Sequence, residues 1–86
     1  MHLSLTSKIW KEGKQYIAYV PELDLSSQGT SRRHAEKRLN EATTLFFEEM
    51  KRMGTLPEFL TSMGFHKKAR GWSAPKVSST NIEIQV

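Results

Sequence analysis

The side chains that could perform acid–base or metal chemistry are scattered along this sequence. Its three histidines, His2, His34 and His66, stand far apart, and none has an acidic residue at the spacing of a metal site. The chain has no cysteine, which excludes disulfides, thiolate zinc sites and cysteine nucleophiles. We interpret the histidines as surface residues and expect neither a metal nor another cofactor.

Carboxylates are the remaining candidates for catalysis. Two-metal cleavage of a phosphodiester needs several carboxylates that converge on metal ions about 4 Å apart. Outside its predicted helices the chain offers only Glu12, Glu22, Asp24 and Glu83. The other acids have surface spacings on helices, as in the i,i+4 pair of Lys37 and Glu41. The sequence therefore predicts solvated carboxylates and a protein that is not an enzyme.

Basic residues outnumber acidic ones, with 13 Lys and Arg against 9 Asp and Glu and a formal charge of +4. The candidate nucleic-acid contacts are Arg32, Arg33, Lys37, Lys67, Lys68 and Arg70. Trp72 follows the second group, and cations beside an aromatic ring can pair with phosphates and stack on bases. The alternative interpretation is a solubilising surface, with Trp72 folded back onto the core.

Three short strands are predicted in the first third of the chain. Residues 2–11 alternate in part between apolar and polar, with Trp10 on the polar face, and Gln15–Val20 is rich in aromatic and β-branched residues. A turn at Gly13 joins these two strands as a hairpin, and residues 25–28 predict a third strand. The expected sheet is small and mostly antiparallel.

One long helix is predicted next, from about residue 32 to residue 52. Ser31 is placed to cap it, and Gly54 is typical of the residue that follows the end of a helix. Apolar residues at spacings of three and four form a stripe that we expect to lie on the sheet: Ala35, Leu39, Ala42, Phe46, Met50 and Met53.

The last third predicts a short helix over residues 55–64, a basic loop over 65–76 and a final strand over 77–86. The whole is a single α+β domain, residues 1–86, of order β-β-β-α-(short α)-β, with the long helix on one face of the sheet. No apolar run approaches the roughly 20 residues that span a bilayer, and no signal-peptide pattern is present. We therefore expect a cytoplasmic protein that does not bind membranes.

The sheet face opposite the helix is predicted to be uncovered. Trp10 and Tyr19 are expected there as an apolar patch that needs a partner. Glu22 and Asp24, near the turn that follows the second strand, could contact a basic partner protein. These four are the candidate partner contacts.

The stretch from Tyr16 to Ala35 resembles the HicB-type antitoxin family. The matching pattern is Tyr16-x-Ala18-x-x-Pro21-Glu22-Leu23, then Ser26-Ser27-Gln28-Gly29, then Ser31 and Ala35. The likeness extends over a core of about residues 1–54. His34 departs from it, because the family usually has Glu there, and no helix pair or ribbon for operator binding is predicted after Gly64.

The resemblance implies a partial RNase H-like fold and a homo-oligomer, a dimer or a tetramer. It also implies a HicA-type toxin as partner, a small ribonuclease that cleaves mRNA and whose catalytic histidine the antitoxin covers. Two other functions stay open: a nucleic-acid-binding oligomeric module, and an orphan HicB-like domain without a toxin.

Overall fold

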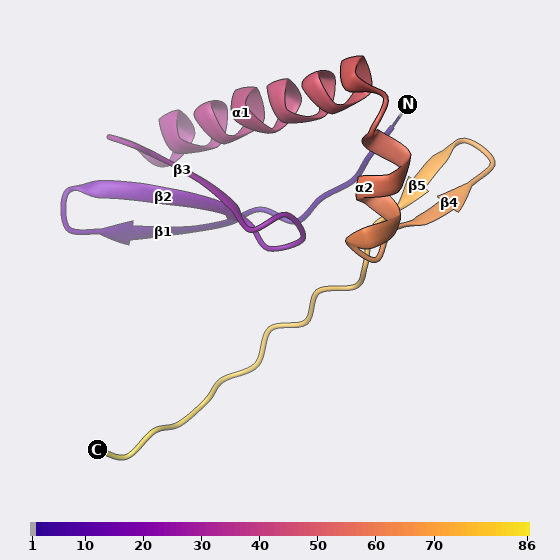
Figure 1. The fold of residues 1–86 in the computed structure, drawn as a ribbon. Coiled ribbons are helices and arrows are strands. Elements are labelled where there is room, and N and C mark those ends of the chain that lie inside the picture. The colour runs from indigo at the N-terminus through magenta and orange to yellow at the C-terminus, as the bar shows by residue number, and fades with distance from the viewer. Residues whose placement is uncertain (1) are drawn as a thin grey trace.

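The first third of the chain forms a three-stranded antiparallel sheet (Figure 1). The computed structural model describes residues 2–86. β1 (Lys8–Glu12) pairs with β2 (Gln15–Val20), and β2 pairs with β3 (Leu25–Gly29), so the strand order is β1-β2-β3. Gly13, at φ 61°, makes the hairpin turn between β1 and β2.

The first strand is shorter than the prediction of residues 2–11, because β1 begins only at Lys8. Lys8 lies opposite Tyr19, and β2 ends one residue later, at Val20. Residues before Lys8 therefore have no neighbouring strand in the sheet. They continue β1 as a segment without strand pairing, except that His2 forms a parallel bridge with Gly71.

α1 (Arg32–Met53) has the predicted boundaries to within a residue. Ser31 Oγ accepts a hydrogen bond from the backbone N–H of His34 at 3.0 Å, as expected of the residue that caps the helix. Gly54 ends the helix in the left-handed conformation at φ 75°, and its N–H donates to the carbonyl of Lys51.

The apolar stripe of α1 is divided between two cores. Ala35 and Leu39 are buried against Ala18 and Val20 of the sheet. The second half of the stripe instead faces α2 (Leu56–Ser62), where the Phe46 and Phe59 rings are 5.3 Å apart, centroid to centroid. The expectation that the whole stripe lies on the sheet is thus wrong, because the helix is longer than the sheet that it covers.

A second core forms where α2 meets the end of α1. Its buried members are Leu56, Leu60 and Phe65, and partly buried Phe47 and Trp72 pack against them. Trp72 thereby folds back onto the core, as in the alternative interpretation of the basic segment.

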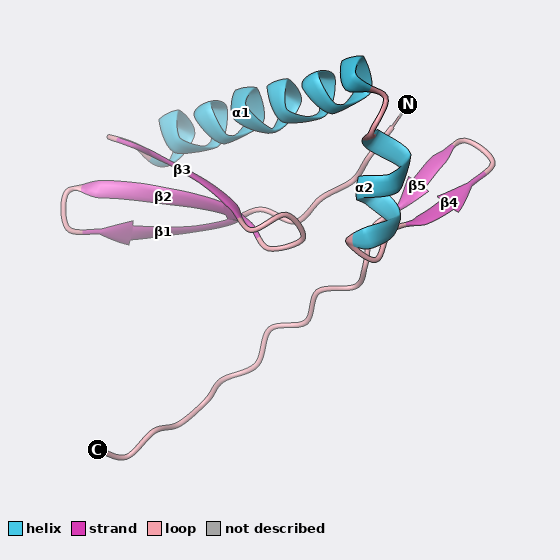
Figure 2. Cartoon of the chain, viewed as in Figure 1, coloured by secondary structure: helices cyan, strands magenta, loops and turns pink. Residues whose placement is uncertain are grey.

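The predicted basic loop over residues 65–76 contains a β-hairpin, so that prediction is wrong. β4 (His66–Lys68) pairs with β5 (Gly71–Ser73), with Lys67 opposite Trp72. Packing of Trp72 in the second core supplies the tertiary contact that holds this hairpin, which its composition did not predict. The secondary structure is drawn in Figure 2.

The final strand predicted over residues 77–86 is absent, and this prediction too is corrected. The chain after β5 has neither helix nor strand and extends away from the folded body (Figures 1 and 2). Alternating apolar residues form a strand only beside another strand, and here the tail lies beside none. The α+β class and the predicted element order are confirmed, with the hairpin β4–β5 as the closing β element.

The described residues contain no helix that is both long and apolar enough to cross a membrane.

Candidate functional site

One face of the three-stranded sheet is not covered by α1 (Figure 1). Ala18 and Val20 point to α1, so the alternate residues Ile17 and Tyr19 point to the opposite side. Trp10 lies opposite Ile17 in the pairing of β1 with β2 and shares that side. We call this surface the open face; across the three strands it consists of Lys8, Trp10, Glu12, Gln15, Ile17, Tyr19, Ser26 and Gln28.

An aromatic pair connects β1 and β2 on the open face. The rings of Trp10 and Tyr19 meet edge to face, with centroids 6.2 Å apart and an interplanar angle of 69°. Such a pair contributes about 0.5–1.5 kcal/mol beyond its buried area. Trp10 is nevertheless 40% exposed, which leaves a large, rigid apolar side chain in contact with solvent. Partner-binding surfaces are enriched in such residues.

Asp24 holds the tyrosine in place. The Tyr19 hydroxyl donates a hydrogen bond to Asp24 Oδ1 at 2.9 Å. This hydrogen bond, followed by desolvation and by the charge of Asp24, raises the pKa of Tyr19 above its usual value. Asp24 itself has φ 52°, a left-handed conformation that aspartate tolerates better than most residues. The turn after β2 therefore presents a carboxylate at the edge of the aromatic pair.

The structure brings together three of the four predicted partner contacts, namely Trp10, Tyr19 and Asp24. Ile17 belongs with them but was missed, although its position two residues before Tyr19 places it on the same face.

Glu22 is separate from these residues and is buried, with 7% of its surface exposed. Its Oε2 accepts a hydrogen bond from the backbone N–H of Thr6 at 2.9 Å, while its Oε1 has no hydrogen-bond partner among residues 2–86. Glu22 thus ties the segment before β1 to the turn after β2. It is not placed to contact a partner at the surface, which corrects that prediction.

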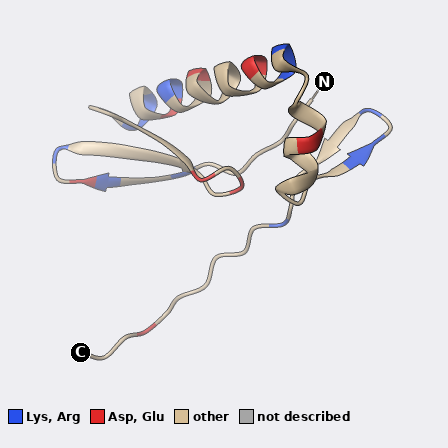
Figure 3. Ribbon diagram, in the orientation of Figure 1, with Lys and Arg blue, Asp and Glu red and all other residues tan. Residues whose placement is uncertain are grey.

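The predicted nucleic-acid contacts fall into two groups at different ends of the molecule (Figure 3). Arg32, Arg33 and Lys37 are exposed on the first turns of α1. Lys67, Lys68 and Arg70 are exposed on β4 and in the turn that follows it, in the hairpin that comes after α2. The 22 residues of α1 span roughly 33 Å at about 1.5 Å each. The two groups therefore do not form one continuous basic surface.

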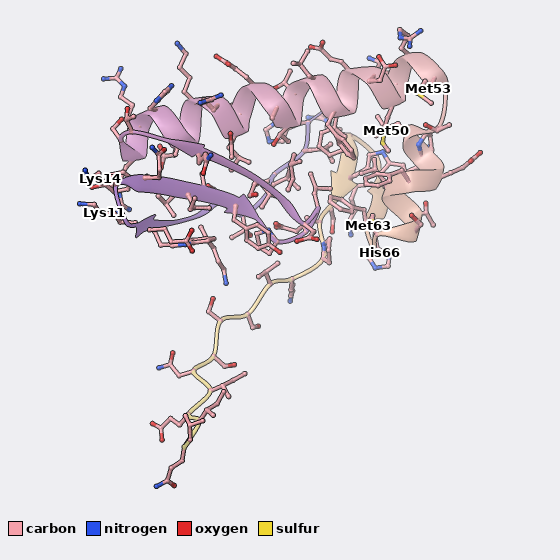
Figure 4. The ribbon with its side chains drawn as sticks, turned by 60° about the vertical axis from the view of Figure 1, so that its left-hand side comes forward. Lys11, Lys14, Met50, Met53, Met63 and His66 are labelled. Atoms are coloured by element: carbon pink, nitrogen blue, oxygen red, sulfur yellow. The ribbon has the colours of Figure 1, made fainter. Side chains whose placement is uncertain are left out.

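Figure 4 shows side chains at the two ends of the molecule. Lys11 and Lys14 lie at the hairpin end of the sheet, whereas Met50, Met53, Met63 and His66 lie at the α2 end. The second end is thus mixed, apolar and basic, and not a uniform cationic surface.

The histidines are not brought together with acids. His34 is exposed at the start of α1, where its Nδ1 lies 3.4 Å from the backbone nitrogen of Thr30. His66 is on β4, and His2 lies beside Gly71. Among residues 2–86, no three His, Asp or Glu side chains are positioned to hold one metal ion.

A groove of about 440 Å³ opens between α1 and the segment before β1. One wall is formed by residues 3–7, the other by the flank of α1 from Glu36 to Phe47, with Val20 between them. The sequence did not predict this groove, because it depends on how far α1 extends over β1.

Comparison of the chain with protein-family models, with curated proteins and with solved structures found no match. A functional proposal thus depends on the geometry of the open face and on the motif likeness over Tyr16–Ala35.

Proposed function

We propose that this chain is a HicB-like antitoxin that binds a small, mRNA-cleaving ribonuclease of the HicA type and blocks its active site sterically. The observation that carries the proposal is the half-exposed aromatic pair Trp10–Tyr19 on the sheet face that α1 does not cover. Aromatic residues at the centre of a surface, held in one orientation, are the typical anchors of protein–protein interfaces.

Such a protein needs a rigid surface and no catalytic group. Stable interfaces bury on the order of 1,200–2,000 Å² in total, which a three-stranded face and its flanking turns can supply in part. Charged residues border the aromatic pair, with Lys8 on the same face and Asp24 at the turn. Charges at the rim of an interface set orientation and association rate, and a carboxylate suits a basic partner.

The alternative function, a nucleic-acid-binding module, has weaker support. It needs cations that follow one phosphate backbone, whereas the predicted contacts form two separate groups, one at the start of α1 and one on the β4–β5 hairpin. The motif likeness over Tyr16–Ala35 also favours the antitoxin.

The test is co-expression with the product of the reading frame adjacent to this chain's gene. We expect that product to arrest growth alone, and the chain to copurify with it and to restore growth. Trp10→Ala should weaken the complex at least about 30-fold, as expected for an anchor worth about 2 kcal/mol. Leu45→Ala is the matched control, because it removes an exposed apolar side chain from α1, and it should bind as the parent does.

Circular dichroism should show that both variants are folded. A toxic neighbour that the chain neither binds nor neutralises would refute the antitoxin function. Equal binding by the Trp10→Ala variant and the parent would refute the open face as the binding surface.

A further inference from the structure

The C-terminal tail (residues 80–86) has the pattern of a strand but no sheet to lie on. Ile82 and Ile84 are 82% and 78% exposed, and Val86 is fully exposed. Polar residues stand between them, so one side of the extended tail is apolar. Alternate apolar side chains on an extended segment indicate a strand that is half-buried in its functional state.

The sheet has a free edge that such a strand can join. In the order β1-β2-β3, only one edge of β1 is paired, and residues 3–7 continue β1 in extended conformation without a strand partner. Apart from the Thr6 N–H, which donates to Glu22 Oε2, the backbone N–H and C=O groups of residues 3–12 that point away from β2 have no strand to pair with among the described residues. Exposed edges of this kind add strands from other chains.

The groove beside this edge fits the apolar side of the tail. Its lining is mixed: apolar side chains come from both walls, namely Leu3, Leu5, Val20, Leu39 and Phe47, and the remaining lining residues are polar, with Glu36 among them. Thr43 Oγ1, also in the lining, is buried without a hydrogen-bond partner among residues 2–86. The groove is thus a gap in the layer between sheet and helix, located where a fourth strand would place its inward side chains.

We propose that the tail of one copy adds to the free edge of β1 in a second copy, with Ile82, Ile84 and Val86 in that copy's groove. The lengths agree, because seven residues at about 3.3 Å each span roughly 23 Å, within the roughly 33 Å of residues 3–12. Glu83 would then lie on the outer side, as Lys8 does, and these opposite charges favour the pairing.

The tail is better placed to pair with the β1 edge of a second copy than with the β1 edge of its own chain. The chain passes its own β1 at Lys8, whose Nζ donates to Ser79 Oγ at 2.8 Å, and from there the tail runs outward. Residues 82–86 contain none of the residues typical of turns, so the end of the tail has no local signal to reverse its direction. The exchange is reciprocal, so each dimer contains two such contacts, and it gives a small domain additional buried apolar surface.

The first test is sedimentation equilibrium of the full chain and of two variants. Ile84→Glu and Gln85→Glu add the same charge at adjacent positions that point to opposite sides of the tail. We expect the parent to dimerise, Ile84→Glu to weaken the dimer at least about tenfold, and Gln85→Glu to change it less than about twofold. A monomeric parent, or equal effects of the two variants, would overturn the proposal.

The second test distinguishes exchange between copies from folding of the tail onto its own chain. Because the protein has no cysteine, Glu83→Cys can carry a single nitroxide label. When the nitroxide-labelled variant is mixed with ¹⁵N-labelled parent chain, the nitroxide should broaden the amide signals of residues 3–12 in the parent. Broadening only when label and ¹⁵N are on the same chain would show that the tail folds onto its own edge, and the proposal would fail. This inference does not depend on a toxin partner, so the antitoxin function can fail without it.

Discussion

At the scale of single residues, Tyr19 and Asp24 determine how the open face is presented. The ring of Tyr19 contacts Trp10, and its hydroxyl donates a hydrogen bond to Asp24 Oδ1 at 2.9 Å. The phenolate could not donate this hydrogen bond and would face a carboxylate, which is why the pKa of Tyr19 is raised. By linkage, the contact stabilises the fold below the ordinary tyrosine pKa and is lost as pH rises through the raised value.

Asp24→Asn should lower the pKa of Tyr19 toward its usual value. The substitution removes the charge, and asparagine tolerates the left-handed conformation of position 24. Phenolate absorbance during a pH titration measures the shift, in a Tyr16→Phe background so that only Tyr19 titrates. An unchanged titration curve would mean that the Tyr19–Asp24 hydrogen bond is not formed in solution.

At the scale of elements, β3 and the start of α1 approach each other closely at Gly29. A Cβ on Gly29 would lie 2.7 Å from the backbone nitrogen of Ala35 and 3.0 Å from the carbonyl carbon of His34. These are backbone atoms of a capped helix end, so they cannot move as a flexible side chain would. The glycine at the end of β3 thus has a packing reason, independent of any function.

Gly29→Ala should destabilise the protein by about 1–3 kcal/mol, the usual cost of overpacking. Urea unfolding monitored by circular dichroism measures the change in the free energy of unfolding. The neighbouring exposed substitution Gln28→Ala is the control and should stay within about 0.5 kcal/mol of the parent. If the two variants are equally stable, β3 and α1 are not in the close contact described.

At the scale of the whole molecule, the positive charge is divided between two ends. Arg32, Arg33 and Lys37 lie at one end of α1, and the cations of the β4–β5 hairpin lie at the other. A net charge of +4 therefore does not act as one binding surface. This separation is a property of the fold, since no local pattern shows which distant residues share a face.

We expect a short single-stranded RNA to bind no more tightly than a Kd of about 10⁻⁴ M at physiological salt. With three cations in each group, log K should fall against log salt with a slope no steeper than about −2. Fluorescence anisotropy at several salt concentrations measures both. Micromolar binding that is lost in a Lys67→Ala/Lys68→Ala variant but kept in Lys11→Ala/Lys14→Ala would favour the nucleic-acid-binding alternative instead.

The sequence by itself determined the elements whose first and last residues are fixed by signals from neighbouring residues in the chain. Ser31 and Gly54 bound α1 because capping and the left-handed conformation are local properties, and the aromatic and β-branched residues of Gln15–Val20 predicted β2. For the same reason the element order was predictable.

Only the tertiary structure decided which segments have a partner. Residues 2–7 and 77–86 have the alternation of strands, yet neither forms one in a single copy, because a strand needs a neighbour about 4.8 Å away and the pattern does not say whether that neighbour exists. The same holds for Glu22, whose burial depends on the Thr6 amide 16 residues away, and for Trp72, whose packing against a distant core turned an expected loop into a hairpin.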